Sequence, residues 1–562
     1  MKKIIYSLLG VAFLFSACED RLNIEQKGVI SFDSFYKTDD DAQNALNNLY
    51  QSFCLNIAGN EGVYVALPVL FDEAGDDMLA AGNMYGDNDF GAQINEFRYD
   101  SQNEVIKNTY WGLYGVIYDC NLILDNIEAN TPVKKRVCGE ARVLRAWSHM
   151  MLAIGWDCPP LVDHILSPSE KPANNAVEGG HNGLLEWCAK EAEAVVADLD
   201  ERESPSDKVG ASKVTKGLAL TVAGKARLFK GDYAGAKADL EQVIASKKYE
   251  LVPTDRWAHL FHESGDLCEE MIFQANVLEN AGIGDWSNKI QRTSWMWIQF
   301  WNWRTDKLAS KPSFIGPDGW GGHSIRADFA ERMLANDGNS VRRKATFLTG
   351  DEFLYEMEWN GTKDKNLSRA ELEKSRDIGI EDPTGLYGFA GYFANKFVAW
   401  PEDNEKGWYG FKNLTIFRYA EVLLMYAEAC AQTTDPTGLG LKCLQDIQNR
   451  AGSAHVSTEL TLQEVKNEKS YEMWLEAVRF PDMVRWGDTD GIVNNGKDIP
   501  VTKDAYFSKD EPIHRLYVEL TNPNKGKTGF VKGKHEYFPY PFDETSINPN
   551  IVQNPSGEAS AE

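Results

Sequence analysis

The sequence concentrates tryptophan in one short segment, WMWIQFWNW. In an extended chain alternate side chains share a face, so Trp295, Trp297, Trp301 and Trp303 would lie together with Gln299. The C–H faces of sugar rings pack well on flat indole rings, which offer a large contact area at a small cost in entropy. The segment therefore predicts a platform for an oligosaccharide, with burial of the same indoles in a core as the alternative.

Other aromatic residues lie in segments rich in glycine and amide side chains. Trp286 and Trp320 lie in glycine-rich segments, and the loop GNMYGDN places Tyr85 between Asn83 and Asn88. An aromatic ring beside hydrogen-bonding side chains suits a sugar ligand, and long loops in compact proteins are often functional. We predict that these five residues also contact ligand, with a solvated loop as the alternative for Asn83, Tyr85 and Asn88.

Motifs for enzymatic catalysis are incomplete. The sequence GIVNNGKD resembles a phosphate-binding loop, but Asp498 stands where the motif needs Ser or Thr to hold magnesium. His259 and His262 lack the order of a zinc protease, and no Gly-x-Ser-x-Gly is present. With 84 acidic residues, chance carboxylate pairs are certain, so a glycosidase is not excluded by counting. No catalytic residue is assigned, and we do not expect an enzyme.

Metal and cofactor motifs are also missing. Asp488 with Asp490, or Asp87 with Asp89, could hold calcium, but the sequence contains no twelve-residue calcium loop. None of the cysteines forms a Cys-x-x-Cys pair. We therefore expect no cofactor and assign no metal ligand. The eight cysteines after Cys18 are too few for a disulfide scaffold in a chain of 562 residues, which favours buried free thiols.

The N-terminus predicts export and a lipid anchor. Lys2 and Lys3 precede an apolar run at 4–15, which is too short to span a bilayer, and small residues precede Cys18. This pattern resembles a bacterial lipoprotein signal in which the thiol of Cys18 is lipidated, although Phe15 stands where Leu is usual. The net charge of −26 excludes nucleic acid as a partner and disfavours attachment to an anionic membrane by charge.

Helical periodicity dominates two parts of the chain. The segment 219–244 has the Leu and small-residue spacing of one tetratricopeptide unit, a helical hairpin that must stack on neighbours. The pair 417–431 and 440–450 has the same form, without a strict 34-residue repeat. Further helices are expected at 39–52, 110–127, 133–154, 184–199, 216–229, 233–246 and 461–478.

The remaining segments predict little regular structure. We predict a long ordered loop at residues 72–97 and a loop-rich insert at residues 253–413. We predict a signal peptide at 1–17, a lipidated tether at 18–31 and one body at 32–562. Within the body, the fold class is mainly α, with a tetratricopeptide-like helical-hairpin scaffold at about 32–250 and 414–487, the irregular ligand-binding insert and an extended tail at 498–562.

Five stretches together resemble the SusD/RagB family of outer-membrane lipoproteins. Their order is that of the family, and they bracket most of the mature chain. Two departures are Ala477, where Gly is commoner after Glu476, and Pro481, which should kink or end its helix. The stretches are EARVLRAWSHMMLAIGWDCPPLVD at 140–163, ARLFKGDYAGAKADLEQVI at 226–244, RYAEVLLMYAEA at 418–429, EKSYEMWLEAVRFPDMVRWG at 468–487 and YPFDETSINPNIVQNP at 540–555.

The resemblance implies a function. Members are surface lipoproteins of the outer membrane that face the cell exterior, cap a SusC-like TonB-dependent transporter and capture oligosaccharides for it, or peptides in some branches. They are not enzymes. We therefore expect glycan capture by aromatic stacking without a covalent step. The alternatives are a peptide-binding member of the same family, a surface glycosidase and a purely structural transporter lid.

Overall fold

The computed structural model describes residues 35–58, 66–80, 89–277, 301–303, 316, 319–349, 352, 392–404, 411–492 and 529–557. This part of the chain is mostly helical, with a few short strands, which confirms the predicted fold class. Cys18 and the segments that hold Asn83, Tyr85, Asn88, Trp286, Trp295 and Trp297 lie outside the described residues.

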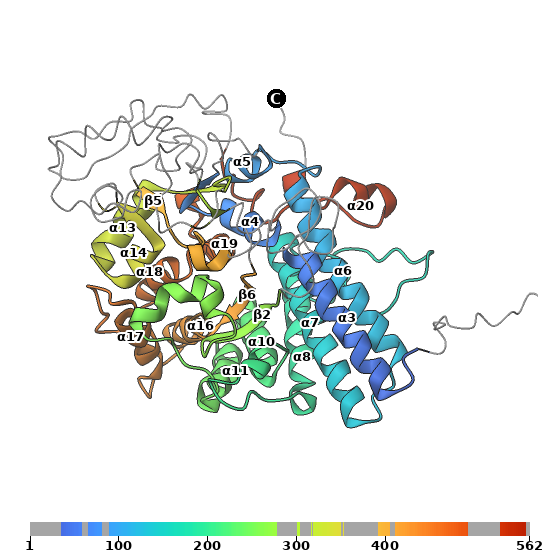
Figure 1. The fold of residues 1–562 in the computed structure, drawn as a ribbon. Coiled ribbons are helices and arrows are strands. Elements are labelled where there is room, and N and C mark those ends of the chain that lie inside the picture. Colours follow the sequence, from blue (N-terminus) through green and yellow to red (C-terminus); the bar gives the residue numbers. More distant parts are fainter. Residues whose placement is uncertain are drawn as a thin grey trace, which may run out of the picture.

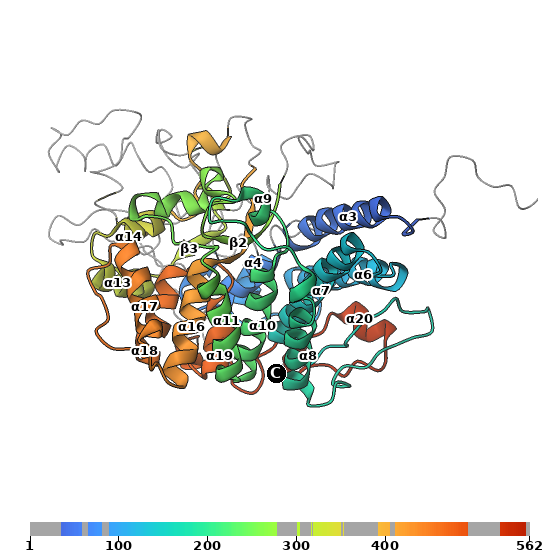
Figure 2. The ribbon, with the colours of Figure 1, turned by 90° about the horizontal axis from the view of Figure 1, so that it is seen from below.

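The scaffold is a row of helices in which each helix packs on the next along the chain (Figures 1 and 2). The helices α16 and α18 continue the row after a long excursion of the chain, and α17 packs on both. In order, the row is α3 (Asp39–Ala58), α6 (Glu104–Asn126), α7 (Pro132–Trp156), α8 (Gly180–Glu193), α10 (Lys216–Lys230), α11 (Tyr233–Ser246), α16 (Tyr419–Gln432), α17 (Leu439–Ala451) and α18 (Leu462–Glu472).

Local sequence explains where these helices begin and end. The side chain of Asn103 accepts hydrogen bonds from the first-turn N–H groups of α6. Thr131 caps α7 in the same way, and Pro132 occupies the first helical position. Gly231 ends α10 with a φ of 83°. A Cβ atom on Gly224 would lie 2.7 Å from Leu240 Cγ, so the glycine allows α10 and α11 to approach closely. These features confirm the helical hairpin predicted at 219–244.

Short elements occupy the parts predicted to be irregular. The segment 72–97 contains a strand and a short helix instead of one loop, and the described part of the insert contains strands and two helices. The three-residue strands were missed because so short a segment has no detectable period. The described helices and strands outside the row are α4 (Ala66–Glu73), β1 (Met78–Ala80), α5 (Asp89–Asn95), α9 (Lys208–Ala211), β2 (Met271–Ala275), β3 (His323–Ile325), α13 (Ala327–Asp337), α14 (Val341–Thr346), β4 (Phe347–Thr349), β5 (Tyr392–Ala394), β6 (Leu414–Arg418), α19 (Arg479–Trp486) and α20 (Phe542–Ile547).

Segments of 3-10 helix complete the described elements. They are η1 (Val196–Asp198), η2 (Thr254–Phe261), η3 (Glu263–Gly265), η9 (Pro401–Asn404), η10 (Thr489–Ile492) and η11 (Pro555–Gly557). The described part of the tail is not simply extended, because α20 lies within it. The tail packs on the end of α7, where Trp156 Nε1 donates to the carbonyl oxygen of Pro539 at 2.9 Å. The eight cysteines are free thiols, as predicted, and Cys54 alone among them is not fully buried.

A buried group of charged side chains joins the scaffold to the insert; we call it the Arg418 network. Arg418 donates to Glu270 at 2.9 Å, to Glu472 at 2.6 Å and to Glu476 at 2.7 Å. Glu472 also accepts from Arg342 at 3.0 Å and from Arg450 at 2.5 Å. The other members are Asp337, Lys396 and Glu468, and all of them are buried.

The family motifs encode much of this network. Arg418 opens the stretch RYAEVLLMYAEA, and Glu468, Glu472 and Glu476 recur at every fourth position of EKSYEMWLEA. The adjacent arginines hold the pKa of the Glu472 carboxyl far below its usual value, despite burial. These motif residues therefore have a structural role and are not ligand contacts.

The helix predicted at 461–478 breaks well before Pro481. It ends at Glu472, and the chain then passes through Leu475 and Ala477, which have φ of 59° and 60°. Pro481 lies in the first turn of α19, where its missing N–H needs no partner. The expectation that Pro481 ends the helix is wrong, because the left-handed residues before it already end the helix.

Substitution of Ala477 by Gly should stabilise the protein. A left-handed conformation costs a non-glycine residue about 1–2 kcal/mol, partly offset by the greater freedom of Gly in the unfolded chain. We expect the free energy of unfolding of Ala477→Gly to rise by about 0.5–1 kcal/mol in urea titrations. Ala238→Gly, on an exposed position of α11, should instead lower it by about 1 kcal/mol. Equal effects of the two variants would contradict the strain assigned to Ala477.

Removal of the Glu472 charge should be strongly destabilising. The variant Glu472→Gln leaves buried arginines without a counter-charge, which costs about 3–5 kcal/mol at pH 7. Because the folded-state pKa of Glu472 is depressed, its contribution is present above the unfolded pKa and is lost as the pH falls. The difference from wild type should therefore shrink by about 1.4 kcal/mol for each pH unit below about 4.3.

The measurement is urea unfolding followed by circular dichroism between pH 3 and pH 7. Glu459→Gln is the matched control, since Glu459 is exposed. A pH-independent difference for Glu472→Gln would show that the lost stability does not come from the carboxylate charge.

Candidate functional site

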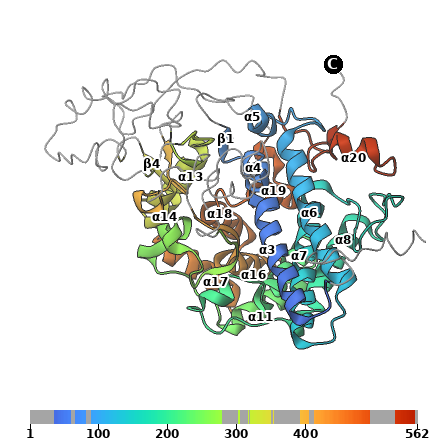
Figure 3. The ribbon, with the colours of Figure 1, turned by 45° about the vertical axis from the view of Figure 1, so that its right-hand side comes forward.

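Two short antiparallel sheets form the base from which the predicted ligand segments extend. In one sheet Met78 pairs with Ile325 and Ala80 with His323; in the other Phe347 pairs with Ala394. The strands β3 and β5 contact each other, and β1 also contacts α4 and α5 (Figure 3). We call residues 78–80, 301–303, 319–325, 347–349 and 392–400 the strand frame.

Residues 301–303 are fastened to this frame by hydrogen bonds from distant parts of the chain. The indole N–H of Trp303 donates to the Ala394 carbonyl oxygen at 2.7 Å, and the Gly319 N–H donates to the Trp303 carbonyl oxygen at 2.9 Å. The side-chain oxygen of Asn302 accepts from the Ala399 N–H at 2.8 Å. This segment is therefore held between the approach to β3 and the exit of β5.

The strand frame brings together the described ends of three predicted ligand segments. The loop with Asn83, Tyr85 and Asn88 begins after Ala80, and Ala80 pairs with His323, shortly after Trp320. The segment with Trp286, Trp295 and Trp297 runs into Trp301. Segments far apart in the sequence thus meet at one place, although their individual contacts with a ligand stay predictions.

Trp301 and Trp303 do not form an open platform. Their exposed fractions are 5% and 2%, and their rings pack at 5.3 Å from Phe397 and 5.8 Å from Phe393. The backbone of Trp301 is helical, so the expected extended alternation does not reach this residue. The physical reason for burial is that both indoles fill space behind β5. Burial in a core was the alternative to a sugar platform, and the packing of these two residues agrees with it. Their contact with ligand stays a prediction.

Trp320 is partly exposed. It lies in a loop that enters β3, and Gly319 before it has no room for a side chain, since a Cβ atom would lie 2.4 Å from the Asn302 carbonyl oxygen. Among the three described tryptophans of the prediction, Trp320 therefore has the geometry that best suits contact with a ligand.

The structure adds one aromatic residue that the sequence reasoning missed. Trp400 follows the segment held by Asn302, is partly exposed, and its ring stacks on the His262 ring with centroids 3.5 Å apart and planes at 14°. Asp403 accepts a hydrogen bond from the Trp400 N–H at 2.8 Å. The sequence signal was an isolated Trp before Pro401, which is too weak to single out without the fold.

Acidic side chains lie buried directly beneath the strand frame, between α4 and β1. Asp76 forms a bidentate pair with Arg479 at 2.7 and 2.9 Å, and these charges lower its pKa. Burial, with the Asp76 charge, raises the pKa of Asp77 to about 7. Burial also raises the pKa of Asp72 and of Glu73 well above their usual values. Burial therefore favours the protonated form of Asp72, Glu73 and Asp77, whereas Arg479 favours the charged form of Asp76.

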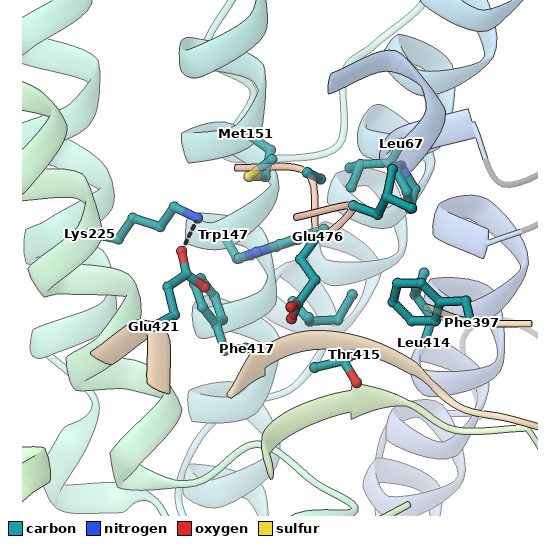
Figure 4. A pocket seen from close by; sticks show the side chains of 14 residues that line it. Leu67, Trp147, Met151, Lys225, Phe397, Leu414, Thr415, Phe417, Glu421 and Glu476 are labelled. Carbon is teal, nitrogen blue, oxygen red and sulfur yellow. Dashed lines mark hydrogen bonds and ion pairs between the residues drawn. The ribbon is translucent and has the colours of Figure 1, made fainter. Parts of the chain in front are cut away.

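An internal cavity lies between α7, α10, β6 and the turn after α18 (Figure 4). It is lined mainly by apolar side chains, and the Lys225–Glu421 ion pair, at 2.8 Å, lies at its wall. Its volume of about 40 Å³ has room for a water molecule or two. Sites for organic ligands typically have roughly 300–1,000 Å³, so this cavity is not the candidate site.

Metal binding finds no support within the described ranges, where no three acidic, His or Cys side chains are arranged to hold an ion. Asp488, a candidate calcium ligand, instead pairs with Lys466 at 2.7 Å. Asp87 lies outside the described residues.

A helical scaffold that carries loop-bearing strands is the architecture of SusD-like binding proteins, and sequence comparison agrees. The family described as "SusD family" matches residues 270–556, just over half of the chain, and "Starch-binding associating with outer membrane" matches residues 31–182. The chain belongs to the SusD family, which confirms the resemblance found in its motifs.

Relatives and solved structures cover almost the whole chain. SusD-like protein P25 of Formosa agariphila is 22% identical over 588 aligned residues, 98% of each chain. A SusD-like protein of Bacteroides ovatus is 22% identical and covers 86% of this chain and 83% of its own. Surface glycan-binding protein A of Bacteroides thetaiotaomicron, solved with laminarihexaose, superposes with a TM-score of 0.70 at 21% identity and covers 92% of this chain and 100% of its own.

The raised pKa of Asp77 predicts a loss of stability as the pH rises towards 7. Because the folded-state pKa of about 7 exceeds the unfolded value of about 3.9, the contribution of Asp77 is fully present below the unfolded pKa and is lost as the pH rises through 7. Asp77→Asn cannot lose a proton. Its unfolding temperature relative to wild type should therefore rise between pH 5.5 and pH 8.5.

Differential scanning fluorimetry over this pH range measures the difference. Asp543→Asn, which removes an exposed carboxylate on α20, is the control and should follow wild type at every pH. A constant offset between Asp77→Asn and wild type would mean that Asp77 does not titrate in this range.

Proposed function

We propose that this protein is a lipid-anchored lipoprotein on the outer face of the outer membrane that captures oligosaccharides at the strand frame. It passes them to a SusC-like TonB-dependent transporter. The observation that carries this proposal is the convergence of three segments rich in aromatic and amide side chains on one frame. Sugar rings would stack on indole and phenol rings while amides hydrogen-bond the hydroxyl groups.

Similar proteins support a carbohydrate as the ligand. One solved structure of similar fold is described as a laminarin-binding SusD-like protein, with a TM-score of 0.69 at 21% identity; the match covers 92% of this chain and 100% of that chain. The surface glycan-binding protein A of similar fold was solved with laminarihexaose. A β-linked gluco-oligosaccharide is therefore the first probe to use.

The membrane attachment in this proposal rests on Cys18. The residues before it have the pattern of a lipoprotein signal. None of the helices in the described ranges is long and apolar enough to cross a bilayer. The description "Starch-binding associating with outer membrane" for the family matched at 31–182 supports the same location.

Binding without catalysis is the chemistry we propose. A glycosidase would need two carboxyl groups on either side of the scissile bond, about 5 Å or about 6.5–9.5 Å apart. Asp72, Asp76 and Asp77 beneath the frame are buried, and Asp76 is paired with Arg479, so these acids are poorly placed to reach a sugar. A peptide-binding role, the alternative within the family, would be favoured by a groove with fewer tryptophans facing solvent.

The test is calorimetric titration of soluble protein that begins after Cys18. Laminarihexaose, other plant, host and microbial oligosaccharides and short peptides are the probes. We expect saturable binding of an oligosaccharide, no release of new reducing ends, and affinity weakened about tenfold or more in Trp320→Ala, which loses one stacking surface.

Trp111→Ala is the matched control, because Trp111 is exposed on α6, where it donates to Glu544 at 2.7 Å. Binding of peptides in place of sugars would favour the alternative role. Formation of new reducing ends would contradict the absence of catalysis. Binding of neither class by the isolated protein would favour a lid that works only with its transporter.

A further inference from the structure

The stacked rings of Trp400 and His262 form a rigid unit at the edge of the strand frame. Their planes are nearly parallel, and His259 meets the edge of the indole with ring centroids 5.0 Å apart and planes at 86°. His262 is buried, whereas Trp400 is partly exposed. The buried imidazole therefore covers one face of the indole.

One buried carboxylate fixes the His262 ring and the backbone of Trp400. Asp403 pairs with His262 Nδ1 at 2.5 Å and accepts hydrogen bonds from the backbone N–H groups of Trp400, at 2.8 Å, and Glu263, at 2.9 Å. The side chain of Trp400 thus has little conformational freedom left to lose when a ligand binds. Preorganisation of this kind raises affinity because the entropic cost of binding falls.

The position of Trp400 connects it to the predicted ligand segments. Ala399, the preceding residue, donates to Asn302 Oδ1 at 2.8 Å and accepts from the Gly316 N–H at 2.7 Å. Asn302 lies between Trp301 and Trp303, and Gly316 lies shortly before Trp320. Trp400 therefore stands beside two of the three segments that meet at the frame.

Trp400 differs from the structural tryptophans of the same region. Trp257, Trp303 and Trp474 are fully buried, and the indole N–H groups of Trp257 and Trp303 bond to protein acceptors. Trp400 is instead partly exposed as a residue, although hydrogen bonds hold its backbone and that of Ala399. Partly exposed His259 and Glu263 lie near it and supply polar groups at its edge.

We propose that Trp400 forms an extension subsite for oligosaccharides, on which one sugar ring of a longer ligand stacks beyond the central site at the frame. This inference rests on the proposed function. The central site would hold a short oligosaccharide by itself, and only a longer chain would reach Trp400. The subsite therefore raises the affinity for longer oligosaccharides and leaves the affinity for short ones unchanged.

Calorimetry with two ligand lengths tests the subsite. Laminaritriose and laminarihexaose are titrated into the protein that begins after Cys18, in wild-type form and as Trp400→Ala and Trp400→Phe. We expect Trp400→Ala to bind laminarihexaose about five- to tenfold more weakly, equivalent to one lost stacking contact, and to bind laminaritriose like wild type. Trp400→Phe, which keeps an aromatic face, should lose less than about threefold.

Different outcomes separate this inference from the proposed function. Unchanged affinity of Trp400→Ala for laminarihexaose would overturn the subsite alone, and equal weakening for both lengths would place Trp400 in the central site instead. Failure of wild type to bind any oligosaccharide of the panel would overturn both proposals. Trp111→Ala is the control for loss of an exposed indole, and it should bind both sugars like wild type.

A second measurement avoids substitution, in case Trp400→Ala disturbs folding. Hydroxyl-radical oxidation of wild-type protein, read by mass spectrometry, should fall at Trp400 when laminarihexaose is added, and should stay constant at Trp111. Laminaritriose should leave both residues unprotected. Equal oxidation of Trp400 with and without laminarihexaose would contradict the subsite.

Discussion

The position of every element around the insert depends on the burial of the Arg418 network. A buried ion loses several kcal/mol of hydration, and the loss is recovered only if each charge meets partners in good geometry. Arg418 lies at the end of β6 and Glu270 just before β2, while Arg450 and Glu472 belong to α17 and α18. A shift of any one of these elements would leave an unpaired buried charge, so the network imposes one register on all of them.

The same constraint reaches the strand frame through Lys396. Lys396 lies two residues after the end of β5. Its ammonium group donates to Glu476 at 2.7 Å and to the Trp474 carbonyl oxygen at 2.6 Å. The left-handed backbone at Leu475 and Ala477 is retained because it allows Glu476 to face Arg418 and Lys396. Since β5 carries the acceptor for Trp303 and leads to Trp400, the strained turn and the charged network together fix where the aromatic residues of the frame lie.

Sequence reasoning predicted what depends on local pattern. The helical hairpin at 219–244 and the helix at 233–246 were found because their periodicity and caps are contained in the segment itself. The strand pairs were not, since Met78 and Ile325 are brought together only by the fold. The burial of Trp303 was undecidable for the same reason, because its acceptor at Ala394 is far away in sequence. The break after Glu472 escaped prediction because Leu475 and Ala477 have no sequence preference for a positive φ.

The contrast between buried motif residues and partly exposed aromatic residues explains why family membership says so little about the ligand. The motifs that identify the SusD family include Arg418, Glu472 and Glu476, whose partners are other buried charges. Loss of any one of these residues would leave a buried charge unpaired. Trp320 and Trp400 are instead partly exposed, on loops whose neighbours can change without leaving a buried charge unpaired. In the proposed function, the choice of glycan depends on the aromatic residues of the frame and its edge, and it can vary while the network stays the same.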